Sequence, residues 1–205
     1  MYTAVFSFLV LSVGWARPAP EDYRAILDAD LGRTVSMLNG TGKYRDAIRV
    51  GGRIQRSVDW FPRVSYEIGY AHHRLGELDA AVRNYDAALL RDPRLTTALY
   101  DRGEIHLQLG RLQLAKDDFL LVAEQNPTHW AGHFRLAHLA GIEGDADDFE
   151  RHLMNAMQHG FDLETMMPDP DWIEFSRKRS IRPVLRKVIV LYGNDALMQW
   201  LGEQP

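Results

Sequence analysis

The 205-residue chain contains no cysteine. This absence excludes disulfides, thiolate zinc sites, cysteine nucleophiles and lipid attachment through cysteine. Excess charge of one sign is also lacking, since 24 Lys and Arg residues against 28 Asp and Glu residues leave a formal net charge of -4. That balance gives no bulk electrostatic reason to expect a nucleic acid or an acidic membrane surface as partner. A hydrophobic share of 46% is ordinary for a soluble chain that forms one domain or one repeat array.

The first sixteen residues differ in character from the rest. The stretch Ala4 to Val13 is apolar except for two serines, and Gly14-Trp15-Ala16 follows it. This order predicts a secretory signal peptide over residues 1–16, cut after Ala16, and hence an exported protein in the periplasm or outside the cell. The stretch is shorter than the roughly 20 apolar residues that cross a bilayer. Because Met1-Tyr2-Thr3 carries no lysine or arginine, an uncleaved hydrophobic helix, a misassigned start codon and a cytoplasmic location stay open.

A period of 34 residues runs through the middle of the chain. Glycines recur at this spacing, and small, aromatic and proline positions keep the same register. The glycine series is Gly42, Gly76, Gly110 and Gly144; the small-residue series are Ala47, Ala81, Ala115 and Gly69, Gly103, Ala137; the aromatic series are Tyr66, Tyr100, Phe134 and Tyr85, Phe119. Such a period is the signature of a solenoid of repeated supersecondary units.

Elementary packing explains each position. The glycines of the first series are expected in the turn after a helix, where a positive φ is wanted. Small residues such as Gly69 and Ala81 are expected where two helices cross. An aromatic ring such as Tyr85 then fills the space toward the next unit, and Pro93 ends one helix and opens the next unit.

These positions resemble the tetratricopeptide repeat family. Residues 62–95 match its six signature positions with Gly69, Gly76, Ala81, Tyr85, Ala88 and Pro93, and residues 96–129 match five, with Val122 in place of alanine. Residues 28–61 and 130–163 resemble degenerate repeats. The resemblance implies an all-α, right-handed superhelix of antiparallel helix pairs over residues 17–161.

Residues 162–205 follow a different pattern. Short helices are expected from the opening Pro168-Asp169-Pro170-Asp171 through Phe175, from about Pro183 to Leu191 and from Asp195 to Leu201. Their apolar positions predict a C-terminal cap on the last repeat.

The resemblance also implies a partner-binding groove on the first helix of each repeat. Mapped onto this chain, its positions are Arg63, Tyr66, Glu67, Tyr70, His73, Arg74, Tyr100, Asp101, Glu104, Gln108, Phe134, Arg135 and His138. Aromatic, arginine and mixed polar residues are typical of protein-binding surfaces, although the aromatic row can equally pack between helices. The clamp that some members use for heat-shock protein carboxylates is absent, since Tyr66, Tyr70 and Asp101 stand in its places.

Three other patterns indicate no further site. Gly40-Thr41-Gly42-Lys43 lacks the first glycine of a phosphate-binding loop, and Tyr44 replaces its Ser or Thr. His129 and His133 are four residues apart, but without the zinc-protease glutamate they predict no metal site. The basic run Arg177 to Lys187 follows several acids in sequence, which favours local charge compensation.

The sequence therefore predicts a protein–protein interaction adaptor or scaffold that is not an enzyme and needs no cofactor or metal. Its expected partner is a protein or peptide, without nucleic acid and without strong membrane association after leader cleavage; self-association into a homo-oligomer fits the same fold. Two alternatives remain: a cytosolic co-chaperone-like or regulatory protein, and an anion-binding or enzymatic protein that uses the basic cap.

Overall fold

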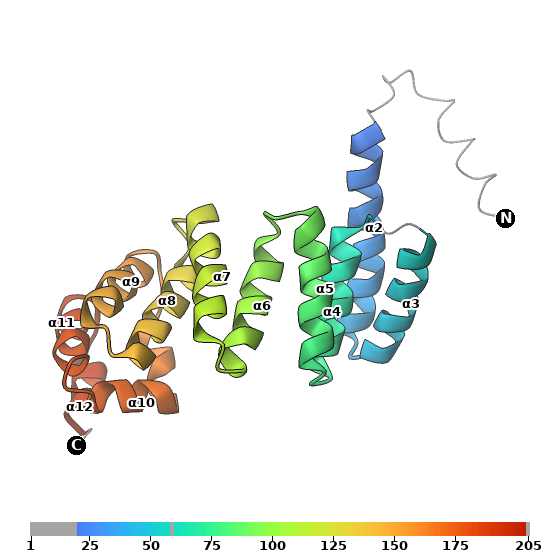
Figure 1. The fold of residues 1–205 in the computed structure, drawn as a ribbon. Helices are drawn as coiled ribbons and strands as arrows, with labels where there is room; N and C mark the ends of the chain where they lie inside the picture. The colour runs from blue at the N-terminus through green and yellow to red at the C-terminus, as the bar shows by residue number, and fades with distance from the viewer. Residues whose placement is uncertain (1–19, 58–59, 204–205) are drawn as a thin grey trace.

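The computed structural model describes residues 20–57 and 60–203, and the predicted leader lies outside these residues. Within them the chain is helical without a strand, as predicted (Figure 1). The elements are α2 (Pro20–Gly40), α3 (Tyr44–Ser57), α4 (Pro62–Arg74), α5 (Leu78–Arg91), α6 (Thr96–Gln108), α7 (Leu112–Gln125), α8 (Trp130–Glu143), α9 (Ala146–Gln158), the 3-10 helix η1 (Leu163–Met166), α10 (Pro170–Arg177), α11 (Arg182–Tyr192) and α12 (Asp195–Glu203).

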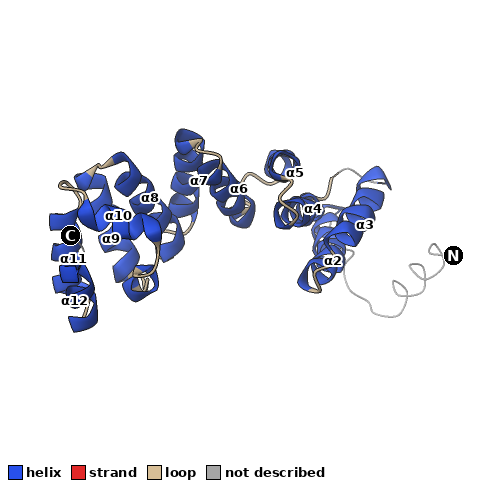
Figure 2. Ribbon diagram, turned by 90° about the horizontal axis from the view of Figure 1, so that it is seen from below, coloured by secondary structure: helices blue, strands red, loops and turns tan. Residues whose placement is uncertain are grey.

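The helices stack in sequence order as antiparallel pairs. The pairs α2/α3, α4/α5, α6/α7 and α8/α9 follow one another along the array, and α10 to α12 gather at its far end (Figures 1 and 2). We call α2, α4, α6 and α8 the first helices and α3, α5, α7 and α9 the second helices. Because each pair contacts mainly its neighbours, the array grows in one dimension.

The four periodic glycines occupy the turns between paired helices. Gly42, Gly76, Gly110 and Gly144 have φ angles of 74°, 75°, 68° and 78°, in the left-handed region that side chains rarely adopt. The backbone N–H of Gly76 donates to the carbonyl of His73, and the next N–H donates to that of His72. These bonds satisfy carbonyls at the end of α4, so the turn prediction is confirmed.

Helix pairs close through a ring seated on a glycine. A Cβ at Gly69 would lie 2.7 Å from the ring of Tyr85, and one at Gly103 would lie 2.7 Å from that of Phe119. Both rings are fully buried. The small residues thus lie where paired helices cross, as predicted. The rings, which were expected to fill space toward the next unit, lie on the glycines of their own pairs, α4/α5 and α6/α7.

In the first pair, α2/α3, an aliphatic side chain fills the space that an aromatic ring fills in the later pairs. Gly51 occupies the place of the missing aromatic, and the side chain of Ile68 reaches back from α4 to within 2.6 Å of where its Cβ would be. The first helix also begins at Pro20, eight residues before the repeat predicted to start at Asp28.

One arginine links three helices across two repeats. Arg102 of α6 binds Asp118 of α7 through Nε and Nη2 at 3.0 and 2.6 Å, and its Nη1 binds Asp86 of α5 at 2.6 Å. The Asp118 side chain is 4% exposed. A bidentate, charge-assisted pair of this kind fixes the orientation of both helices.

The C-terminal helices cover the last pair, as predicted. Trp172 and Phe175 of α10 are buried against α8, where a Cβ at Gly141 would lie 2.6 Å from the Phe175 ring. Leu185 and Ile189 of α11 extend the same core. The observed bounds differ from the expected ones by one or two residues.

Lys178, Arg182 and Lys187 of the basic run have partners, and only Lys178 pairs with one of the acids immediately before the run. Lys178 pairs with Glu174, whereas Lys187 pairs with Glu150 of α9. Arg182 donates to the carbonyls of Ser176 and Leu201. Half of the six cations thus hold the cap in place.

Two histidines join α8 to α9. The Nδ1 atoms of His133 and His152 lie 3.0 Å apart, so one ring donates and the other accepts. His152 is 8% exposed. Its burial, helped by the cations Arg151 and Lys116 and by His133 against an opposing effect of Asp148, lowers its pKa from 6.5 to about 4.

The glycine contacts predict opposite effects for two alanine substitutions. Gly103→Ala should lower the free energy of unfolding by about 1 kcal/mol or more, because overpacking costs about 1–3 kcal/mol and exceeds the gain in helix propensity. Gly52→Ala is the matched control, since the nearest atom to its Cβ would be an Arg56 nitrogen at 3.8 Å. That variant should gain stability in urea unfolding. Equal effects of the two substitutions would contradict the packing account.

The histidine pair predicts a loss of stability in mild acid. A pKa lowered from 6.5 to about 4 means that the unfolded chain binds a proton first as pH falls. His152 therefore contributes stability above pH 6.5 that is lost progressively toward pH 4, up to about 3 kcal/mol. His152→Leu should flatten this dependence in urea titrations across the range. A slope that His152→Leu does not reduce would show that another group controls it.

Candidate partner-binding groove

Hydrogen bonds connect each first helix to the next. The backbone N–H of Arg63 donates to Asp28 at 3.0 Å, and the Tyr66 hydroxyl donates to Asp101 at 2.9 Å. Arg135 Nε donates to the Tyr100 hydroxyl at 3.1 Å. All three bonds span 35 residues, one more than the repeat period, so each joins neighbouring repeats. The bonds of Tyr66 to Asp101 and of Arg135 to Tyr100 lie at equivalent repeat positions.

Three hollows follow one another along these helices, and together we call them the groove. The proximal hollow, about 340 Å³, is lined by Ala29, Gly32, Arg33, Ser36, Arg63, Tyr66, Glu67, Leu95 and Thr97. The middle hollow, about 480 Å³, is lined by Tyr66, Thr96, Thr97, Tyr100, Asp101, Val122, Asn126, His129, Trp130 and Ala131. The distal hollow, about 510 Å³, is lined by His73, Glu104, Leu107, Gln108, Leu112, Arg135, His138, Ile142, Asp169 and Asp171.

The middle hollow is walled by aromatic rings. Tyr66 stacks on Tyr85 with ring centroids 5.7 Å apart, and Tyr100 tilts on Phe119 at the same separation. Trp130 also lines this hollow. Because the tyrosine rings rest on the buried aromatics that close the helix pairs, these walls are held rigidly before any partner arrives.

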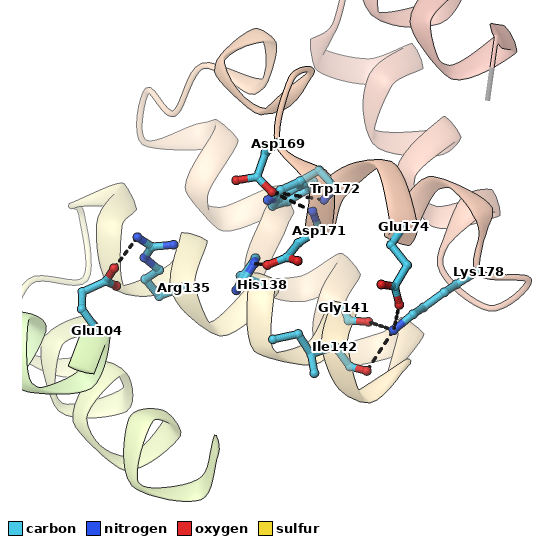
Figure 3. Close-up of polar contacts among 10 residues, drawn as sticks. All are labelled: Glu104, Arg135, His138, Gly141, Ile142, Asp169, Asp171, Trp172, Glu174 and Lys178. Atoms are coloured by element: carbon cyan, nitrogen blue, oxygen red, sulfur yellow. Dashed lines mark hydrogen bonds and ion pairs between the residues drawn. The ribbon is translucent and has the colours of Figure 1, made fainter. Parts of the chain in front are cut away.

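The distal hollow combines charged side chains with aliphatic ones. Arg135 Nη2 binds Glu104 at 2.5 Å, and the imidazole of His138 contacts the Asp171 carboxylate at 2.9 Å (Figure 3). Asp169 accepts from the backbone N–H of Asp171 at 2.9 Å and so caps α10. The cap therefore contributes one wall of this hollow.

Burial raises the pKa of three groove carboxyls, those of Glu67, Asp101 and Glu104. Hydrogen bonds from Asn39 and Tyr66 lower the pKa of Glu67 and Asp101 in part, and Arg135 does so for Glu104. Hydrogen bonds and the charge of Arg135 thus offset only part of the cost of removing these three carboxylates from water. The groove therefore holds negative charge that the chain itself does not fully balance.

Ten of the thirteen predicted groove residues line the three hollows. They are Arg63, Tyr66 and Glu67; Tyr100 and Asp101; and His73, Glu104, Gln108, Arg135 and His138.

Three predicted groove residues lie elsewhere. Phe134 is 5% exposed, and its ring stacks on Phe161 at 4.4 Å, so it belongs to the core beneath the cap. The prediction that its side chain faces a partner is wrong, because the cap covers this end of the aromatic row. Tyr70 and Arg74 line none of the three hollows, and Arg74 lies over the rings of Tyr44 and Tyr70.

Several lining residues were missed. Thr97 is exposed and shared by the proximal and middle hollows. It occupies the same repeat position as Arg63, so the period could have identified it. Asp169 and Asp171 follow no repeat register, and only the fold brings them to the groove.

The motifs set aside in the sequence have structural roles. The His129 ring caps α8 by accepting from the N–H of Ala131. Gly42 is a turn glycine. Across residues 20–57 and 60–203, no group of three or more His, Asp or Glu side chains is placed to hold a metal ion. In the same residues no helix is long and apolar enough to span a bilayer.

Known proteins share this repeat. Residues 66–129 match the family model described as tetratricopeptide repeat. A tetratricopeptide repeat and J domain-containing co-chaperone of Fusarium oxysporum is 38% identical over 76 residues, which are 37% of this chain and 15% of that protein. The match thus spans less than a fifth of the relative.

Solved structures share the fold. MamA AMB-1 superposes with a TM-score of 0.60 at 19% identity, covering 89% of this chain and 92% of that one. MamA from Desulfovibrio magneticus RS-1 gives a TM-score of 0.54 at 20% identity, with 86% and 92% covered. The first repeat domain of Spaghetti (RPAP3), bound to an HSP90 peptide, gives 0.52 at 22% identity, with 55% and 90% covered. The period, the paired helices and the family match together identify tetratricopeptide repeats over residues 66–129 of this chain.

Proposed function

We propose that this protein is an interaction adaptor that holds a peptide segment or partner helix in the groove. The observation that carries the proposal is the set of three hollows along the first helices. The middle hollow has aromatic walls, and the distal hollow holds more carboxylates than arginines. Aromatic and arginine side chains set in pockets are typical anchors of protein interfaces.

The groove is suited to binding because it is already formed. Tyr66, Tyr100 and Arg135 are each fixed by a hydrogen bond to the neighbouring first helix. A partner therefore incurs little ordering cost on this side of the interface, which leaves more of the contact energy as affinity.

The comparisons support the class of function and not a particular ligand. The RPAP3 domain was solved with an HSP90 peptide, but Tyr66, Tyr70 and Asp101 stand where a carboxylate clamp needs basic or amide side chains. The co-chaperone relative, whose name combines a tetratricopeptide repeat with a J domain, favours a co-chaperone-like adaptor as second candidate. Both candidates use the same groove.

We also propose that the protein is exported, on the strength of the apolar stretch Ala4 to Val13 and the small residues that follow it. N-terminal sequencing of the protein purified from its host should then begin at Arg17. A mature protein that begins at Met1 would contradict export and support a cytosolic role.

The groove proposal predicts that a bulky residue at position 97 blocks partner capture. Thr97 borders two hollows, is exposed, and belongs to no inter-helix bond among those that order the groove. Thr97→Trp therefore fills the groove without removing a contact of the fold. Affinity capture from the host, followed by mass spectrometry, should recover a partner with wild type and lose it with this variant.

A second groove variant and a control outside the groove complete the test. Gln113→Trp places tryptophan on the exposed surface of α7 and should keep the partner. Gln108→Trp fills the distal hollow and should lose it. Retention of the same partner by both groove variants, with unchanged circular dichroism, would show that binding occurs elsewhere.

A further inference from the structure

The distal hollow lies where three first helices end. His73, Gln108 and Ile142 line it from the last turns of α4, α6 and α8. The C-terminal turn of a helix carries the partial negative charge of its dipole, which favours cations nearby. The backbone thus makes this hollow electronegative before side chains are considered.

The side chains add to that field. Glu104, Asp169 and Asp171 line the hollow against one arginine, Arg135. Burial lowers the pKa of His138 and so disfavours the imidazolium form that would cancel the charge of Asp171. The N-terminus of α10 offsets Asp169, which it holds as a cap, and Glu104 and Asp171 still outnumber the one cation.

Two polar atoms at this hollow have no hydrogen-bond partner, and both are acceptors. Glu104 Oε1 is unpaired although Oε2 binds Arg135. His138 Nδ1 is also unpaired, and the side chain is only 6% exposed. Because its Nε2–H donates to the Asp171 carboxylate, Nδ1 carries a lone pair. The residues that line the hollow are therefore short of donors as well as of positive charge, and both unpaired atoms are buried.

The protein itself places an ammonium at the end of one of these helices. Lys178 Nζ donates to the carbonyls of Gly141 and Ile142 in α8 at 2.9 and 3.0 Å, with Glu174 at 3.4 Å (Figure 3). This lysine shows that helix-end carbonyls beside a carboxylate hold a cationic side chain in this fold.

We propose that the distal hollow receives a lysine or arginine side chain of the partner segment. The inference rests on the proposed function and adds the chemical class of the ligand. The middle hollow, with its rings of Tyr66, Tyr100 and Trp130, receives an apolar side chain of the same segment. The partner is thus a segment that carries both a basic and an apolar anchor.

A peptide library tests the ligand class with the full chain. The probe is a positional-scanning set of acetylated, amidated twelve-residue peptides, whose blocked ends remove terminal charges. Wild type should enrich lysine or arginine together with an aromatic or aliphatic residue. The affinity of the best peptide should also fall as salt rises from 50 to 500 mM, because salt screens charge pairs.

Isosteric substitutions then test the position. Glu104→Gln with Asp171→Asn keeps an acceptor for Arg135 and for His138 while removing both charges. This double variant should bind the selected peptide about tenfold to a hundredfold more weakly by fluorescence anisotropy. The matched control, Asp117→Asn with Glu124→Gln, removes two charges from the exposed side of α7 and should bind as wild type does.

The outcomes separate this inference from the proposed function. Peptides that Thr97→Trp excludes but that show no basic preference, or an acidic one, would overturn the charge inference and leave the groove as the binding site. Peptides selected without any dependence on Thr97 or Gln108 would overturn both. An equal loss of affinity in the Asp117/Glu124 control would also overturn the inference, because it would trace binding to net charge.

Discussion

The contact on which the array depends is an aromatic ring lying against a glycine. The rings of Tyr85 and Phe119 each occupy the space that a Cβ on Gly69 or Gly103 would need. This contact sets how closely the two helices of a pair approach, and the period of 34 residues repeats it at the next pair. The same rings then support Tyr66 and Tyr100 from below. The buried packing of the pairs thus determines where the aromatic walls of the groove stand.

The polar residues of the groove have two roles. Tyr66 with Asp101 and Arg135 with Glu104 align successive first helices, so they are part of the fold. The same residues place carboxylates in a half-buried setting where burial raises the pKa of both carboxyls. Hydrogen bonds and Arg135 offset only part of this effect of burial. A structure that is stabilised by these pairs therefore also presents an excess of acceptors and negative charge toward whatever enters the groove.

The repeat period predicted most of the fold because each of its positions has one dominant physical cause. A positive φ at Gly76 and close approach at Gly69 are local demands that residue type reveals directly. Ten groove residues followed from the same register. Phe134 was misplaced because the cap, which has no repeat, buries it. Asp169 and Asp171 were missed for the same reason, since only tertiary folding carries them to α8. Ile68, which replaces the missing ring beside Gly51, has no signal in the period either.

The central claim is that a partner lies along the first helices and not on the second ones. Site-specific photo-cross-linking tests it most directly, with p-benzoylphenylalanine placed at position 97 in one protein and at position 113 in another. Both positions are exposed, one in the groove and the other on α7. The account predicts that the captured partner becomes cross-linked from position 97 and not from position 113. Cross-linking from position 113 alone would contradict it.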